Sequence, residues 1–154
     1  MSLKNVRPGP FSVAEYQMSG VPFVTGSSTD EVVHNAATRV QFPYVTSEII
    51  VQCSGSDPLY VGFSEHGVRG DIASGETHRF QLEKPELSTM GPSNALSRLE
   101  LKVRCTELWF MAASPNGGAV TTGFQLVASL TNIPSKNMFT LTGSLNDPQF
   151  KGIG

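Results

Sequence analysis

Charged residues are scarce in this chain, since Asp, Glu, Lys and Arg together make up 16% of its 154 residues. The 11 Lys and Arg are scattered singly and form no basic stripe, and the formal net charge at pH 7 is -2. Such a chain produces no long-range positive field that would attract phosphate backbones. We therefore expect no direct binding to nucleic acid.

Cysteine is scarce as well, with only Cys53 and Cys105 in the sequence. Two thiols do not make the disulfide framework that staples small secreted domains. Each thiol lies at the end of an expected strand. We therefore interpret both as small core hydrophobes, with a disulfide bridge or a redox role as the alternative.

Long apolar runs are missing too. No segment reaches the ~20 consecutive apolar residues that span a bilayer. The N-terminal sequence M-S-L-K-N-V-R-P-G-P lacks the apolar stretch of a secretory signal. Synthesis in a cytosol is the expectation that follows.

Signatures of catalysis and metal binding are also absent from the sequence. A metal centre needs several converging ligands, whereas His34, His66 and His78 stand apart, each in or beside an expected loop. There is no Gly-X-Ser-X-Gly nucleophile elbow, and neither cysteine belongs to a recognisable active-site pattern. We expect no enzymatic activity and no cofactor.

What the chain does contain is the material of short strands and turns. Hydrophobic residues make up 39% of it, and it has 15 Gly and 10 Pro, a composition typical of a β-rich globular domain. Residues 1–20 are rich in Pro, Gly and polar groups without a clear period. We predict an extended N-terminal arm over residues 1–20 and one domain over residues 21–154.

The clearest strand signal lies between Ser97 and Ala113. In its first part, apolar residues alternate with charged ones, which places all apolar side chains on one face of a pleated strand. The apolar set is Leu99, Leu101, Val103 and Cys105, and the charged set is Glu100, Lys102 and Arg104. A second apolar run, Leu108 to Met111, follows after two residues and is too short for a helix.

Further strands are predicted over residues 21–25, 38–53, 59–64, 77–83, 122–131 and 138–143, with loops over 26–35 and 65–76 and no proper helix. Pro43 interrupts the longest strand and predicts a bulge or a change of sheet there. This pattern favours an all-β fold, a single eight-stranded jelly roll of two packed antiparallel sheets. An immunoglobulin sandwich would need a Trp between two cysteines, whereas Trp109 follows Cys105.

Arg69, Gly70 and Asp71 form the one short sequence with a known binding use. An exposed Arg and Asp separated by Gly can bridge an integrin and its bound metal ion, and the tripeptide lies in the Gly-rich segment H-G-V-R-G-D-I-A-S-G. The alternative is a charged turn in which Gly supplies backbone freedom. The sequence leaves both readings open, and the receptor-binding loop is a hypothesis.

Trp109, Phe110 and Met111 cannot all face the core if their strand alternates. Either Phe110 or the Trp109 and Met111 pair points outward. The strand could be central and covered on both sides, or these side chains could form an apolar contact between subunits.

Several segments together resemble the single jelly-roll penton proteins of large icosahedral double-stranded DNA viruses. They are V-Q-F-P-Y-V-T-S-E-I-I-V (Val40 to Val51), L-Y-V-G-F-S (Leu59 to Ser64), E-L-W-F-M (Glu107 to Met111), F-Q-L-V-A-S-L-T-N-I (Phe124 to Ile133) and T-G-S-L-N (Thr142 to Asn146). The resemblance covers the chain from Pro22 to its C-terminus.

The resemblance implies a structural capsid protein of the virion, synthesised in the host cytoplasm. Five copies would form the pentamer at each fivefold vertex by head-to-tail contacts that close a ring. Its partners would be neighbouring major and minor capsid proteins, through the N-terminal arm, and a spike or host receptor at the loops of one end.

Jelly rolls also occur in cupin enzymes, lectins and cytokine-like trimers, so the fold alone does not decide the function. The alternative from another class is a carbohydrate-binding, lectin-like module. Its aromatic platforms would be Tyr16, Tyr60 and Trp109. A cytokine-like ligand is opposed by the missing export signal.

Overall fold

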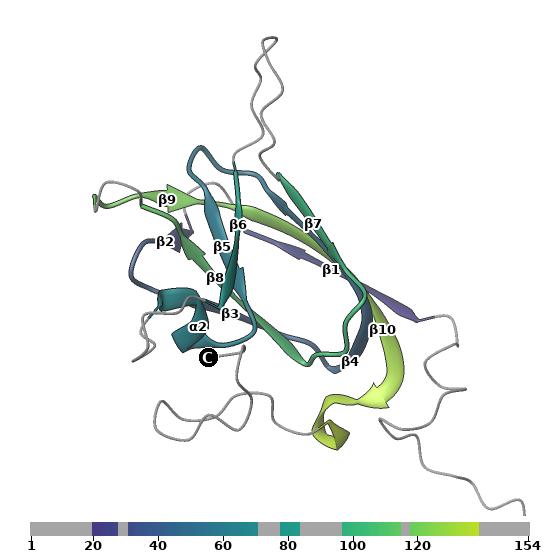
Figure 1. Cartoon of the computed structure of the whole chain (residues 1–154). Helices are drawn as coiled ribbons and strands as arrows, with labels where there is room; N and C mark the ends of the chain where they lie inside the picture. Colours follow the sequence, from purple (N-terminus) through teal and green to yellow (C-terminus); the bar gives the residue numbers. More distant parts are fainter. Residues whose placement is uncertain (1–19, 28–30, 71–77, 84–96, 115–117, 139–154) are drawn as a thin grey trace, which may run out of the picture.

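The computed structural model describes residues 20–27, 31–70, 78–83, 97–114 and 118–138, and these are almost entirely β-structure (Figure 1). The strands are β1 (Val21–Gly26), β2 (Val32–Val33), β3 (Thr38–Gln41), β4 (Tyr44–Cys53), β5 (Leu59–Gly62), β6 (Arg79–Leu82), β7 (Arg98–Leu101), β8 (Glu107–Ala112), β9 (Thr121–Thr122) and β10 (Phe124–Pro134). The helical elements are α2 (Glu65–Arg69) and the 3-10 turn η1 (Ser135–Asn137).

Two four-stranded sheets carry the fold, with strand orders β1-β10-β4-β7 and β3-β8-β5-β6. The strands pair antiparallel in a nested order, from the outermost pair in the sequence to the innermost: β1 with β10, β3 with β8, β4 with β7, and β5 with β6. This nested pairing is what results when one long hairpin is wound into a sandwich, which is the jelly-roll topology. The predicted all-β jelly roll is confirmed. The predicted arm lies in residues 1–20, of which only Gly20 is described.

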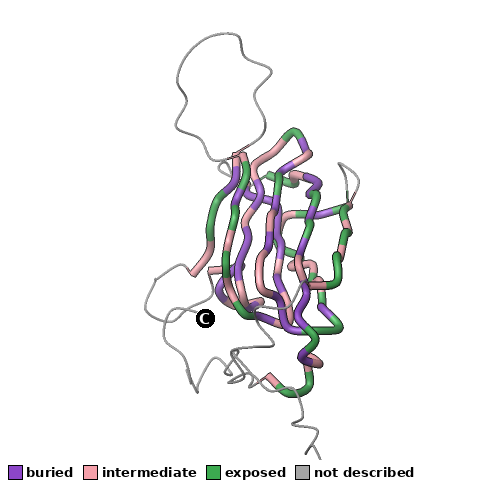
Figure 2. The backbone as a smooth tube through the Cα atoms, turned by 90° about the vertical axis from the view of Figure 1, so that its right-hand side faces the viewer, coloured by how far each residue is buried: buried purple, intermediate pink, exposed green. Residues whose placement is uncertain are grey.

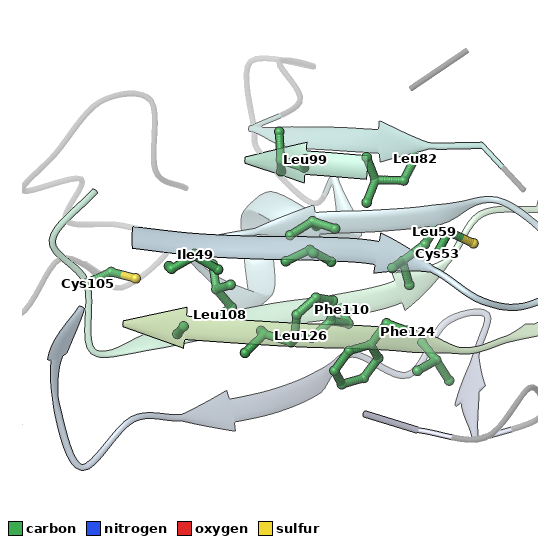
Figure 3. Close-up of a cluster of buried hydrophobic side chains, with 14 of the residues drawn as sticks. Ile49, Cys53, Leu59, Leu82, Leu99, Cys105, Leu108, Phe110, Phe124 and Leu126 are labelled. Carbon is green, nitrogen blue, oxygen red and sulfur yellow. The ribbon is translucent and has the colours of Figure 1, made fainter. Parts of the chain in front are cut away.

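The core lies between the inner faces of the two sheets. Figure 3 shows buried side chains from strands of both sheets gathered in one cluster, and Figure 2 shows buried and more exposed residues following one another along the strands. The rings of Phe110 in β8 and Phe124 in β10 stack with centroids 4.1 Å apart, which joins the sheets. Such a pair contributes about 0.5–1.5 kcal/mol beyond the area it buries.

Pro43 marks the point where the chain changes sheet, as the sequence predicts. The strand before it, β3, belongs to one sheet and the strand after it, β4, to the other. Proline has no N–H to donate to a strand ladder, so no ladder hydrogen bond is lost when it stands at the corner between the sheets. The corner is held by the Phe42 N–H, which donates to the Thr106 carbonyl at 2.8 Å, and by the Pro43 carbonyl, which accepts from Ser135 N–H at 3.1 Å.

The strand predicted over Leu99 to Cys105 is paired only as far as Leu101. Its alternation still holds, because the charged residues are exposed while Leu99 and Cys105 are buried. Beyond Leu101 the chain is held by Thr46 of β4, whose hydroxyl donates to the Val103 carbonyl at 2.8 Å and accepts from Cys105 N–H at 3.0 Å. The Thr46 side chain thus adds to a single backbone bond in this segment, in which Thr46 N–H donates to the Cys105 carbonyl at 3.0 Å.

The loop predicted over residues 65–76 and the absence of a helix were wrong for residues 65–69, which form α2. Local capping explains the helix: the Ser64 hydroxyl accepts from Gly67 N–H at 2.9 Å, and Glu65 pairs with Arg69 at 2.8 Å. Gly70 ends it in the left-handed region, with φ 77°. The sequence therefore contained a signal for this helix, because Ser64 and Gly70 are residue types that often begin and end helices.

Two smaller differences concern short elements. The loop predicted over residues 26–35 contains β2, which pairs with β9 in a separate two-stranded ladder. The last strand was predicted over residues 138–143. The backbone N–H of Met138 instead donates to the Ser135 carbonyl and closes η1, and residues 139–143 lie outside the described residues.

Candidate interaction surfaces

Arg69 and Gly70 of the suggested receptor-binding tripeptide lie at the C-terminal end of α2. The Arg69 guanidinium pairs with Glu65, and its side chain is 38% exposed. Gly70 uses its left-handed backbone to cap the helix, and its N–H donates to the His66 carbonyl at 2.9 Å. Asp71 lies outside the described residues. The described part of the tripeptide thus serves as a helix terminus, and receptor binding stays a prediction.

Helix α2 packs on the outer face of the second sheet, against β5 and β8 (Figure 1). Val68 is fully buried there and lies over Gly62, where an added Cβ would stand 2.6 Å from Val68 Cγ2. The Arg79 guanidinium donates to the Val68 carbonyl at 2.6 Å and stacks over the Tyr60 ring at 3.6 Å. Gly62 and Arg79 therefore fix the helix in place, which the linear sequence does not reveal.

The three residues of the suggested subunit contact separate in the structure. Phe110 points into the core and is fully buried. Met111 lies on the opposite face of β8, on the side where α2 packs, and is 2% exposed. Only Trp109 is partly exposed. A central strand covered on both sides accounts for Phe110 and Met111, and a subunit contact could involve Trp109 alone.

Trp109 belongs to a polar cluster on the same outer face. Its indole N–H donates to Glu107 Oε1 at 3.3 Å, and the Arg39 guanidinium lies 5.6 Å from its ring centroid. Arg39 Nε also donates to Glu107 Oε2 at 2.8 Å. The two aromatic platforms of a lectin-like site, Tyr60 and Trp109, thus each carry an arginine of the same chain over the ring. Tyr16 lies outside the described residues.

Charge on the outer face of the first sheet is concentrated on its edge strand β7, where the register places Glu100 beside Ile50 and Arg98 beside Gln52. Across the three adjacent strands β1, β10 and β4, Glu48 is the only charged residue. The strand register places Val24, Val127 and Ile50 side by side on this outer face. Val24 is 72% exposed and Val127 is 45% exposed, while Ile50 is partly buried. We call these three residues the Val24 row.

An exposed aromatic side chain lies on an edge strand of the second sheet. Phe80 of β6 is 43% exposed, although its register partner Val61 is fully buried. The charged residues on β6 and directly after it are Arg79 and Glu83, and Arg79 is held by the Val68 carbonyl and the Tyr60 ring.

Both cysteines are buried and free, so the interpretation as core hydrophobes is confirmed. Burial raises the pKa of the Cys105 thiol from 9.0 to about 11, and the hydrogen bond between this thiol and the Thr46 hydroxyl opposes this only in part. A thiol of this kind is protonated at physiological pH and is a poor nucleophile.

The histidines are not gathered into a ligand set. His34 Nδ1 lies 3.1 Å from the Ala112 carbonyl, and within the described ranges no group of three or more His, Cys, Asp or Glu could hold a metal ion. None of the helices in the described residues is long and apolar enough to cross a membrane.

Comparisons with family models, curated proteins and solved structures give no match for this chain. The resemblance to penton proteins is therefore a prediction from the sequence, and the functional conclusion depends on the fold and on the surfaces described above.

Proposed function

We propose that this chain is a structural capsid protein whose homopentamer forms the fivefold vertices of an icosahedral double-stranded DNA virus. One observation carries the proposal: the segments that resemble penton proteins are the paired strands of a jelly roll. Val40 to Val51 spans β3 and β4 across the Pro43 corner, and the other described segments coincide with β5, β8 and β10. The resemblance therefore lies on the scaffold itself.

The function is mechanical. Each copy uses two different surfaces, one toward the preceding copy and one toward the next, and the rotation between copies closes after five subunits. No bond is made or broken in this process. Neighbouring major and minor capsid proteins would surround the ring, and the loops at one end of the strands would be free for a spike or a host receptor. The protein would be synthesised in the host cytoplasm and reside in the virion.

The test is the native mass of the purified full chain, measured by light scattering behind a sizing column over a wide range of concentrations. We expect about five times the chain mass of 16.5 kDa. A stable trimer would contradict the proposal and favour a cytokine-like assembly. A monomer at every concentration would contradict assembly in solution, and a positive glycan screen of that monomer would favour the carbohydrate-binding alternative.

A further inference from the structure

We draw no further inference here: the strongest candidate, the Val24 row on the outer face of the first sheet, lies beside the charged edge strand β7, and nothing in the described part of the chain shows what covers it.

Discussion

Replacing Gly62 with alanine tests whether α2 is locked onto the sheet by backbone proximity. The added Cβ would stand 2.6 Å from Val68 Cγ2 and 3.1 Å from the His78 carbonyl oxygen, whereas carbon atoms in contact prefer about 3.5–4.0 Å. Val68 is fully buried and β-branched, so it cannot simply rotate away. We expect Gly62→Ala to lower the free energy of unfolding by about 1–3 kcal/mol, the usual cost of overpacking.

The matched control for this prediction is Val68→Ala, which removes the colliding methyl group. Alone it should cost about 1–3 kcal/mol through a lost contact and a small cavity. In the double variant the alanine Cβ occupies part of the space that Val68 leaves, so the combined loss should be smaller than the sum of the two single losses.

The assay is urea unfolding followed by the fluorescence of Trp109, the only tryptophan, which pairs with Gly62 across β5 and β8. All variants are compared at one protein concentration, because self-association adds to apparent stability. Two results would refute the close packing of α2 on β5. One is a loss of unfolding free energy in the double variant equal to the sum of the two single losses, and the other is a Gly62→Ala chain as stable as the unmodified one.

Three further predictions concern other contacts. Gly70→Ala should lose about 1 kcal/mol of stability in thermal unfolding, because φ 77° is unfavourable for a residue with a Cβ, and unchanged stability would contradict this cap. Thr46→Val should lose about 1–3 kcal/mol in urea unfolding, because Cys105 N–H loses its acceptor in a buried site, whereas Ser47→Ala, at a partly buried position, should lose less. The raised pKa of Cys105, about 11 against 9.0, means that the unfolded chain loses this proton first, so its contribution to stability is lost as pH rises from 9 to about 11. Stability measured between pH 8 and pH 11 should therefore fall less steeply in Cys105→Ala, and equal slopes would contradict the buried thiol.

The strands of the fold could be predicted because their signals are local. In β10, alternate apolar residues predicted one buried face, and Phe124, Leu126, Ala128 and Leu130 are all buried. Pro43 predicted a bulge or a change of sheet, of which the structure has the change of sheet, because a missing N–H is a property of the residue itself. The error over α2 arose because the glycines between residues 65 and 76 were taken as a sign of a loop. Gly67 lies inside the helix, and its N–H bonds to the capping Ser64.

The candidate surfaces could be predicted only in part. A strand with Trp109, Phe110 and Met111 in succession raises the question of which side is covered, but the helix that packs against β8 comes from a distant part of the chain. The Val24 row was missed, since its three valine and isoleucine residues belong to three strands that are far apart in sequence. A signal was present all the same: the segments 21–26, 44–53 and 124–134 together contain one charged residue.

The sequence by itself determined the class of the fold, the positions of most strands and the face that several of them bury, because side-chain alternation and turn residues act over a few positions. Only the tertiary structure decided which strands are neighbours and in what register. Strand register is fixed when long-range pairing buries the apolar faces together, and a shift of one residue would turn every side chain to the other side. The same register places Val24, Val127, Ile50 and Glu100 side by side across the outer face of the first sheet.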